Sequence, residues 1–224
     1  MIKAVLFDLD GTLLDRDASL KNFIEAQYNR LNEWLGHISK SRYAERFIEL
    51  DARGYVWKDK VYQQLAEEFR ISGISPEDLL QDYVAEFKHY CVPFPGLIAM
   101  LEELKRKSIS LGMITNGRGQ FQLDNIQALG IESYFDIILI SEWEEMKKPD
   151  PEIFKKAMKE LQVQPADCLF VGDHPKNDVK AARSVGMKGV WKIDPQWTDV
   201  EADYQINELQ EVLDLLKEKT AASL

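Results

Sequence analysis

Carboxylates, lysines and hydroxyls follow short apolar runs at four separate points of this 224-residue chain. In chain order, the four groups are Asp8–Thr12, Thr115–Gly117, Lys147–Pro149 and Gly172–Asp178. Aspartates offer oxygen ligands and nucleophiles, whereas lysine, threonine and backbone amides can hold an anion. These side chains can act together only if the fold brings the four groups to one place.

The first group carries two aspartates with an informative spacing. Asp8 and Asp10 lie two residues apart on what we expect to be extended backbone, so their side chains point the same way. Like charges that close would strongly raise the pKa of one carboxyl group unless a cation lies between them. Asp173 adds a third carboxylate, and hard oxygen ligands in that number suit a Mg²⁺ ion shared with a substrate phosphate. The aspartates therefore predict a magnesium site.

The same residue types could carry out phosphoryl transfer. A carboxylate that attacks phosphorus gives an aspartyl-phosphate, which is a known covalent strategy. A second carboxylate nearby can protonate the leaving oxygen and later activate water. A lysine, a hydroxyl, backbone amides and a metal ion can stabilise the negative charge spread over the transferred group. All of these groups are present after the four apolar runs.

The apolar runs are near-continuous rather than alternating. They are Ala4–Phe7, Leu111–Ile114, Ile137–Ile140, Leu169–Val171 and Val190–Ile193. Such runs are typical of strands that are buried on both faces of a parallel sheet. Amphipathic helical patterns separate them, so the sequence predicts an α/β fold with a doubly wound, Rossmann-like parallel sheet. Ligands of such sheets bind beyond the carboxyl ends of the strands, where the four groups would lie.

One region breaks the alternation of strand and helix. From about residue 17 to residue 90 only helical periodicity is found, in stripes over 20–35, 61–69 and 76–87. This stretch is too long for a simple crossover between two strands. We therefore expect an all-α domain over residues 17–91, inserted into an α/β core of residues 1–16 and 92–224. The last residues, Thr220–Leu224, are expected to fray.

Taken together, the four groups resemble the four ordered motifs of the haloacid dehalogenase (HAD) superfamily. The motifs are Asp8–Thr12, Thr115–Gly117, Lys148–Pro151 and Gly172–Asp173 with Asp178. Order, spacing and strand context all match, and the resemblance covers the whole chain. The helical insertion resembles the cap that members of this superfamily carry between the first two motifs. The resemblance implies a magnesium-dependent phosphatase that works through an aspartyl-phosphate.

The resemblance also implies a role for each matching residue. It makes Asp8 the nucleophile and a metal ligand, and Asp10 the general acid and base whose backbone carbonyl also faces the metal. Only one of the adjacent Lys147 and Lys148 can point inward, and the family pattern favours Lys148. The other implied roles are phosphoryl binding by Thr115, Asn116, Gly117 and Lys148, catalytic neutralisation of the nucleophile by Lys148, Mg²⁺ ligation by Asp173, and an indirect or water-mediated part for Asp178.

Five further residues stay open between a part in the site and a purely structural one. Thr12 belongs to the first motif. His174 could tune the surroundings of the metal or be an exposed loop residue near the mouth of the site. Arg118 could reach the substrate or be a solvated residue of a first helical turn. Tyr55 and Lys58 lie in a glycine-marked loop that resembles the cap loop reaching into the active site of similar proteins, although its aromatic side chains could instead pack the helical domain.

Composition limits the partners. The formal net charge of −10 argues against nucleic acid or an anionic membrane surface, but it does not exclude a small anionic substrate. No segment reads as a signal peptide or a membrane span, and neither Cys91 nor Cys168 has metal-ligand spacing, which favours the cytoplasm. We expect a small phosphorylated metabolite as partner, no nucleic acid, no membrane, and either a monomer or a homodimer.

Asp10 also separates subclasses of the superfamily. Haloalkanoate dehalogenases resemble this chain but lack the second aspartate, because they have no oxygen leaving group to protonate. Thr115–Gly117 followed by Gln122 resembles the subgroup of nucleotide and sugar phosphatases, so hydrolysis of a small phosphorylated metabolite is the leading hypothesis. A phosphomutase of the beta-phosphoglucomutase kind shares the core and stays open. A non-catalytic phospho-accepting switch is the third possibility, although it has no need of Asp10 or of a long insertion.

Overall fold

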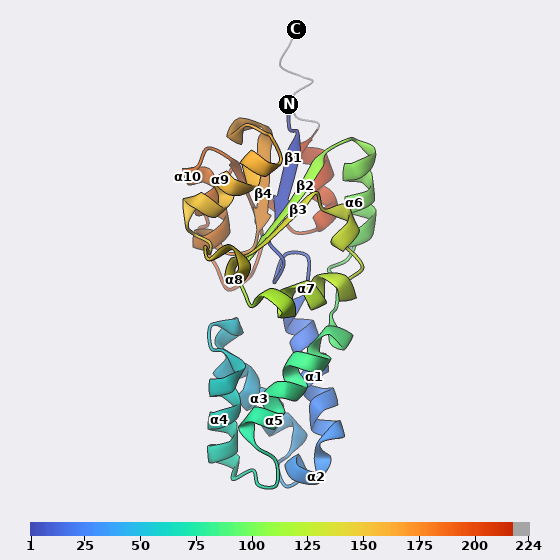
Figure 1. Ribbon diagram of the computed structural model, residues 1–224, viewed down its shortest axis with the longest axis vertical. Coiled ribbons are helices and arrows are strands. Elements are labelled where there is room, and N and C mark those ends of the chain that lie inside the picture. The colour runs from blue at the N-terminus through green and yellow to red at the C-terminus, as the bar shows by residue number, and fades with distance from the viewer. Residues whose placement is uncertain (217–224) are drawn as a thin grey trace. The chain divides into compact units, whose positions relative to one another are not determined.

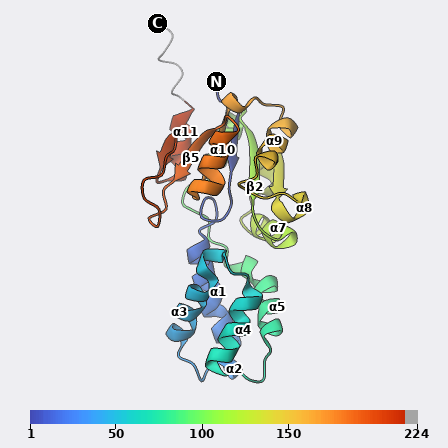
Figure 2. The same cartoon turned by 90° about the vertical axis from the view of Figure 1, so that its left-hand side faces the viewer.

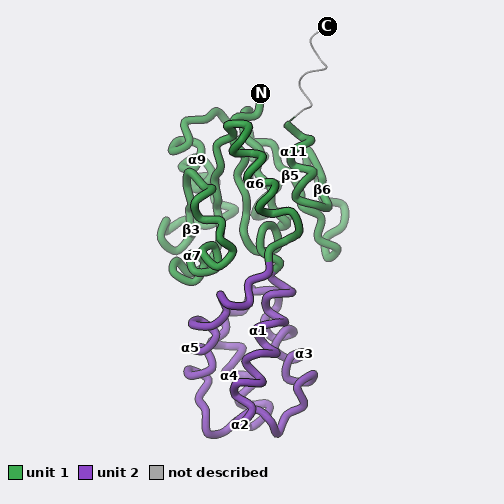
Figure 3. The backbone as a smooth tube through the Cα atoms, turned by 90° about the vertical axis from the view of Figure 1, so that its right-hand side faces the viewer, with its two compact units in different colours: residues 1–15, 93–224 green, residues 16–92 purple. Residues whose placement is uncertain are grey.

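The computed structural model of the protein describes residues 1–216, so the expected fraying of Thr220–Leu224 lies outside the described residues (Figure 1). The chain divides into two compact units (Figure 3). The α/β unit comprises residues 1–15 and the described part of 93–224, and the helical unit comprises residues 16–92. The expected division fell at 16/17 and 91/92, one residue away at each junction.

Six parallel strands form the sheet of the α/β unit, in the order β3-β2-β1-β4-β5-β6. They are β1 (Ala4–Phe7), β2 (Ser110–Thr115), β3 (Ile137–Ile140), β4 (Cys168–Gly172), β5 (Lys188–Lys192) and β6 (Tyr204–Ile206). The predicted doubly wound parallel sheet is confirmed, and the first five strands fall on the five apolar runs. The analysis did not predict β6, because this edge strand has three residues of which only Ile206 is buried.

Helices cover both faces of the sheet. They are α6 (Leu97–Arg106), α7 (Gly119–Ala128), α8 (Ser141–Glu144), α9 (Pro151–Glu160), α10 (Ala181–Ser184) and α11 (Val212–Leu215). Helices α9 and α10 lie on one face and α6 on the other, as Figures 1 and 2 show. On the α9 face, Phe154 packs edge-on against Phe170 of β4 with 5.0 Å between ring centroids. The core is therefore built on both sides of β1 and β4.

The order of the strands places the ends of β1 and β4 next to each other. β1 is fully buried and pairs with β2 on one side and with β4 on the other. The chain winds outward in opposite directions from this pair, to β3 on one side and to β6 on the other. Such a topological switch point is where open parallel sheets bind their ligands. Residues that directly follow β1 and β4 consequently meet, although they are far apart in sequence.

The helical unit contains α1 (Arg16–Arg30), α2 (Asn32–Leu35), α3 (Lys40–Asp51), α4 (Lys58–Phe69) and α5 (Pro76–Glu86), with 3-10 turns η1 (Ala52–Gly54) and η2 (Phe87–Tyr90). The expected stripe over 20–35 is broken at Leu31, where α1 ends and α2 begins. No apolar stripe was identified over helix α3, which lies in the region expected to be all-α and buries Tyr43 and Phe47. Among residues 1–216, no helix is both long and apolar enough to cross a membrane.

A buried amide joins four helices of this unit. Gln27 of α1 is 0 % exposed, and its Nε2 donates to Leu79 O at 3.2 Å and to Asp82 Oδ2 at 2.9 Å. Its Oε1 accepts from the hydroxyl groups of Tyr62 at 2.9 Å and Tyr43 at 3.4 Å. Helices α1, α3, α4 and α5 thus share one hydrogen-bond network. Because such a network is worth most when every member is satisfied, it fixes how these helices pack.

Replacing Gln27 by methionine should destabilise the protein strongly. The variant leaves buried hydroxyl and carbonyl groups without partners, and we expect the free energy of unfolding to fall by about 2–4 kcal/mol. Urea unfolding followed by circular dichroism measures this change. The matched control is Gln64→Met, because Gln64 is exposed and bonds only Glu68 on the surface of α4. Similar losses in both variants would contradict the structural role of Gln27.

Candidate active site

Side chains from four loops converge beyond the carboxyl ends of the central strands. Asp8 directly follows β1, and its amide donates to Val171 O of β4 at 2.9 Å, which continues the pairing of the two strands. Thr115 is the last residue of β2, and Gly172 ends β4. The loop after β3 supplies a lysine. The four sequence groups therefore come from adjacent points of one sheet edge.

Lys148 is the centre of the cluster. Its Nζ lies 2.6 Å from Asp8 Oδ1 and 2.7 Å from Asp178 Oδ1, and the residue is 3 % exposed. The Asn116 side chain holds its backbone, since Asn116 Nδ2 donates to Lys148 O and Lys148 N donates to Asn116 Oδ1, both at 2.9 Å. Lys147 is exposed. Of the two adjacent lysines, the inward one is thus Lys148.

Three carboxylates form a cluster here, and two of them, Asp8 and Asp178, contact this ammonium group. Oxygen atoms of Asp8, Asp173 and Asp178 all lie within 4.8 Å of one another. Asp178 was expected to act indirectly, but its carboxylate belongs to this group as closely as those of the other two. Both of its oxygens are held, one by Lys148 and the other by the backbone N–H of His174 at 3.0 Å. The side chain of Asp10 instead accepts a hydrogen bond from Gln122.

The buried charges are not balanced. Burial raises the pKa of Asp8 to about 7, and the charge of Asp178 adds to the rise although Lys148 opposes it. Burial also raises the pKa of Asp173 to about 8, again with a contribution from Asp178. Burial lowers the pKa of Lys148, but the charges of Asp178 and Asp8 outweigh it, so this pKa is raised. Three carboxylates facing one ammonium group fit a divalent cation as the missing positive charge.

Two glycines allow the carboxylates to approach one another. Gly11 has φ +80°, and a Cβ at this position would lie 2.6 Å from Asp173 Oδ2. A Cβ at Gly172 would lie 2.6 Å from Asp178 Oδ2. Both distances are too short for real atoms, so any side chain at either position would displace an aspartate. The indole N–H of Trp191 also donates to Asp173 O at 2.9 Å, which fixes the loop after β4.

The residues expected to bind phosphoryl oxygens are only partly free to do so. Thr115 is fully buried, and its Oγ1 accepts from Gln122 Nε2 at 2.7 Å. The Asn116 amide is used on Lys148, and the backbone N–H of Gly117 donates to Ser141 Oγ at 2.9 Å. Any part of Asn116 in phosphoryl binding would therefore fall to its backbone. These roles stay predictions.

The five open residues occupy different positions. Thr12 is buried, and within residues 1–216 its Oγ1 has no hydrogen-bond partner. His174 Nδ1 accepts from the backbone N–H groups of Lys176 and Asn177, so its side chain caps the turn η5 (Pro175–Lys180). Burial lowers the pKa of His174, in keeping with a ring nitrogen that accepts. Arg118 is exposed at the N-cap of α7.

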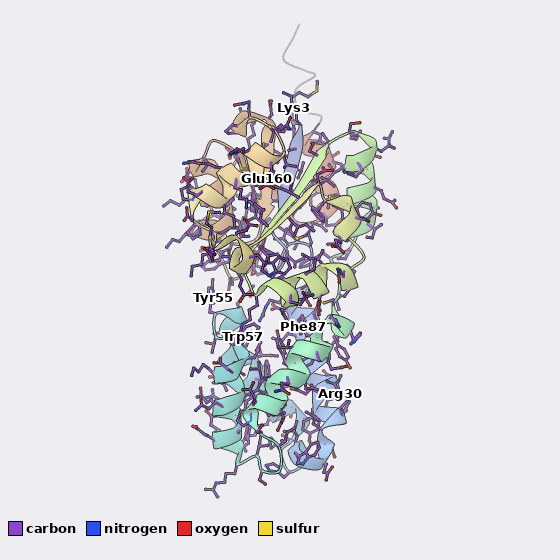
Figure 4. The ribbon with its side chains drawn as sticks, viewed as in Figure 1. Lys3, Arg30, Tyr55, Trp57, Phe87 and Glu160 are labelled. Atoms are coloured by element: carbon purple, nitrogen blue, oxygen red, sulfur yellow. The ribbon has the colours of Figure 1, made fainter. Side chains whose placement is uncertain are left out.

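Tyr55 and Lys58 belong to the helical unit. Tyr55 is 66 % exposed on the loop before α4, beside Trp57 (Figure 4). The Lys58 ammonium is buried inside the unit, where it pairs with Asp51 and lies 5.2 Å from the centre of the Tyr83 ring. Lys58 is therefore held within its own unit by a buried ion pair. A part for either residue in substrate binding stays a prediction.

Two residues of this region had no role in the sequence analysis. Gln122 was noted only as a family-like residue, and Trp191 only as part of an apolar run. A polar amide one helical turn into α7 and a tryptophan near the end of β5 are weak signals, because both types are common in cores. Their hydrogen bonds to Asp10 and to the Asp173 backbone became visible only in the folded structure.

The family of haloacid dehalogenase-like hydrolases matches residues 5–192, and the chain belongs to this family. Glyceraldehyde 3-phosphate phosphatase from Pyrococcus furiosus is 30% identical over 99% of this chain and 95% of its own length. Phosphoserine phosphatase from Thermus thermophilus is 28% identical over 94% of this chain and 98% of its own. A crystal structure of a HAD phosphatase from Thermococcus onnurineus matches with a TM-score of 0.68 and 31% identity over 96% of this chain and 98% of that chain. The predicted enzyme class, a HAD-like phosphatase, is confirmed.

A methyl group at Gly172 should damage the site without unfolding the protein. In Gly172→Ala the new Cβ displaces Asp178, which holds Lys148, and misplacement by about 1 Å can lower rates about 100-fold. We expect a loss of that size in the rate of phosphate release. Gly130→Ala is the control, because a Cβ there meets no atom within 4 Å although its φ of +70° makes the substitution mildly destabilising. Full activity of Gly172→Ala would contradict the close packing described for Asp178.

Proposed function

We propose that this phosphatase hydrolyses a small phosphorylated metabolite through an aspartyl-phosphate formed on Asp8, with Mg²⁺ bound to the carboxylate cluster. The observation that carries the proposal is the position of Asp8, which is buried at the switch point of the sheet beside Lys148. The carboxylate is thus oriented, partly neutralised and shielded from water. These are the conditions in which a carboxylate can act as a nucleophile toward a phosphate ester.

In the first step, the carboxylate oxygen of Asp8 that Lys148 does not hold attacks phosphorus. The bond between phosphorus and the ester oxygen breaks, and Asp10 gives its proton to the departing alcohol. Lys148 stays protonated and neutralises charge on the nucleophile and the phosphoryl group. In the second step Asp10, now ionised, accepts a proton from water, which attacks the phosphorus. Inorganic phosphate leaves, and the Asp8 carboxylate is regenerated.

The side chains of Asp8, Asp173 and Asp178, with the backbone carbonyl of Asp10, would hold the metal. When bound, Mg²⁺ would neutralise the carboxylates and the phosphoryl oxygens, which Lys148 cannot do alone. The charge imbalance of the cluster supports this assignment. Asp10 also supports phosphoryl chemistry over dehalogenation, because only an oxygen leaving group needs its proton.

The names of two relatives indicate the size of the substrate. Glyceraldehyde 3-phosphate phosphatase and phosphoserine phosphatase, two relatives of this chain, are named for three-carbon monophosphates. We infer a substrate of similar size and charge for this protein. The helical unit would act as a cap that excludes water and large substrates and so sets specificity. Nothing in the described residues favours a phosphomutase or a phospho-accepting switch over hydrolysis.

Asp8→Asn should abolish phosphate release. An amide oxygen is a poor nucleophile, so the rate with p-nitrophenyl phosphate and with a panel of phosphorylated metabolites should fall at least about 1,000-fold. The panel is scored by kcat/KM and by the products formed.

The parent enzyme should release free phosphate in amounts equal to the alcohol. If the parent formed a phosphorylated isomer instead, it would be a mutase, and a single slow self-labelling event would identify a switch.

Magnesium should stabilise the protein more at high pH than at low pH. Burial raises the pKa of Asp8 and Asp173 to about 7 and about 8, above the ordinary aspartate value of 3.8. The metal-free folded state therefore keeps protons that the unfolded state has lost, and these groups make stability fall as pH rises from about 4 to about 8. Since Mg²⁺ requires the ionised carboxylates, it should restore more stability at pH 8 than at pH 5.

Melting temperatures with Mg²⁺ and with EDTA at both pH values measure this effect. Asp173→Asn is the matched variant, because it removes one carboxylate from the cluster while nearly preserving its shape. We expect this variant to melt higher than the parent in EDTA at pH 8 and to respond less to Mg²⁺. Equal responses of the parent at both pH values would contradict a metal site built from these aspartates.

A further inference from the structure

A buried amide lies against two residues of the proposed mechanism. Gln122 of α7 is 2 % exposed, and its Nε2 donates to Asp10 Oδ2 at 2.8 Å and to Thr115 Oγ1 at 2.7 Å. Its Oε1 accepts from Asn125 Nδ2 at 3.4 Å. Within residues 1–216, Gln122 is the only side chain that hydrogen-bonds the Asp10 carboxylate. The amide therefore joins the proposed general acid to a proposed phosphoryl ligand.

The number of hydrogen atoms on the amide fixes the direction of these bonds. A glutamine NH₂ group has two hydrogens, and its two short contacts use both. A longer contact to Asn116 O, at 3.4 Å, can only share one of them. Because Asp10 and Thr115 both accept from the same nitrogen, neither can donate to it. The amide thus determines which oxygen of Asp10 can be protonated and in which direction the Thr115 O–H can donate.

For Asp10, the bond selects one oxygen. Its Oδ2 is held by Gln122, so the proton of the acid form resides on Oδ1. A general acid must hold its proton within about 3 Å of the leaving oxygen, and a carboxyl group without a fixed neighbour would rotate and lose that alignment. The loop after β1, in which Asp10 forms an isolated bridge with Leu14, sets where the carboxyl group is, and Gln122 sets how it is turned.

For Thr115, the bond selects the direction of the hydroxyl hydrogen. Its Oγ1 accepts from Gln122, so its own O–H is left to donate elsewhere. The hydroxyl of Thr115, at the carboxyl end of β2, can give that hydrogen to a phosphoryl oxygen. One glutamine would therefore prepare the donor for the transferred group as well as the acid for the leaving group.

The local sequence makes room for this side chain. Gln122 lies one turn into α7, where helical side chains lean back toward the N-terminus and so toward the end of β2. A Cβ at Gly117 would lie 2.7 Å from Gln122 Cγ, so the glycine lets the side chain pass close to the backbone. Two independent features, the buried amide and the missing side chain, are thus fitted to each other.

We propose that Gln122 is a positioning residue, which turns the Asp10 carboxyl group toward the leaving oxygen and the Thr115 hydroxyl toward the phosphoryl group. This proposal rests on the proposed function, because it deepens the roles assigned there to Asp10 and Thr115. It differs from a purely structural role in one measurable respect. A structural defect lowers the rate with every substrate, whereas a misdirected acid lowers it most when the leaving group needs the proton.

The experiment compares two substrates in Gln122→Met, which keeps the length of the side chain and removes both donors. One substrate is p-nitrophenyl phosphate, whose leaving phenolate departs without much help. The other is the alkyl monophosphate that the parent enzyme hydrolyses fastest in the metabolite panel. The measured quantity is kcat/KM, because it reports the steps up to departure of the alcohol. Inhibition by inorganic phosphate is measured in parallel.

We expect kcat/KM to fall about 10- to 100-fold further for the alkyl ester than for the aryl ester, since general acid catalysis contributes about 100-fold or more. Inhibition by phosphate should weaken several-fold, because the Thr115 hydroxyl is no longer directed. Gln122→Glu should lose more, since its carboxylate repels Asp10 and takes the Thr115 hydrogen. Gly117→Ala, which displaces Gln122 without altering it, should show the same preference for the aryl ester.

Two controls separate the possible failures. Gln120→Met lies on the same helix, where Gln120 is exposed and, within residues 1–216, hydrogen-bonds Asp124 alone. This variant should leave kcat/KM unchanged for both substrates. Equal losses for the two esters in Gln122→Met and Gln122→Glu, or no loss in either, would overturn the positioning role. If Asp8→Asn kept its activity in the same assay, the proposed function itself would fail, whatever the Gln122 variants did.

Discussion

Buried negative charge at the ends of β1 and β4 is the constraint that organises this site. Asp8 and Asp178 hydrogen-bond a single ammonium group, and oxygen atoms of Asp8, Asp173 and Asp178 lie within 4.8 Å of one another. Carboxylates in this position would be costly without compensation, and removing one partner of a buried charge pair leaves the other uncompensated. Lys148 therefore has to be held accurately. Asn116 does this by accepting from and donating to the backbone on either side of the lysine.

The topology of the sheet explains why residues so distant in sequence can form this cluster. β1 and β4 are neighbours only because the chain reverses its direction of winding between them, and Asp8 pairs with the end of β4 through its backbone. The approach is closer than side chains at Gly11 or Gly172 would allow. The geometry of the cluster thus depends on the missing Cβ atoms of these two glycines as well as on the aspartates themselves.

The sequence predicted what depends on local pattern and missed what depends on tertiary geometry. Five near-continuous apolar runs indicated five buried strands, and the groups that follow them came together at one edge. The edge strand β6 was missed because it is only three residues long, and no apolar stripe was identified over helix α3, where apolar Ile48 lies on the exposed face. The hydrogen bonds of Asn116 with the Lys148 backbone and of Gln122 with Asp10 could not be inferred either. A side-chain amide has no local signature that identifies its partner across 32 or 112 residues.

The neutrality of these two amides is itself informative. A lysine or arginine in place of Gln122 would also donate to a carboxylate, but its charge would favour the ionised form and so leave the acid without the proton that it has to give to the leaving oxygen. An amide has no net charge, so it favours an ionised carboxylate less strongly than a lysine or arginine would. Lys148, in contrast, contacts Asp8, the proposed nucleophile, which would work best when ionised. The charged donor and the neutral donor are thus each matched to the role proposed for the aspartate that they contact. Lys148, in the loop after β3, would serve the proposed nucleophile, and Gln122, in α7, would serve the proposed acid.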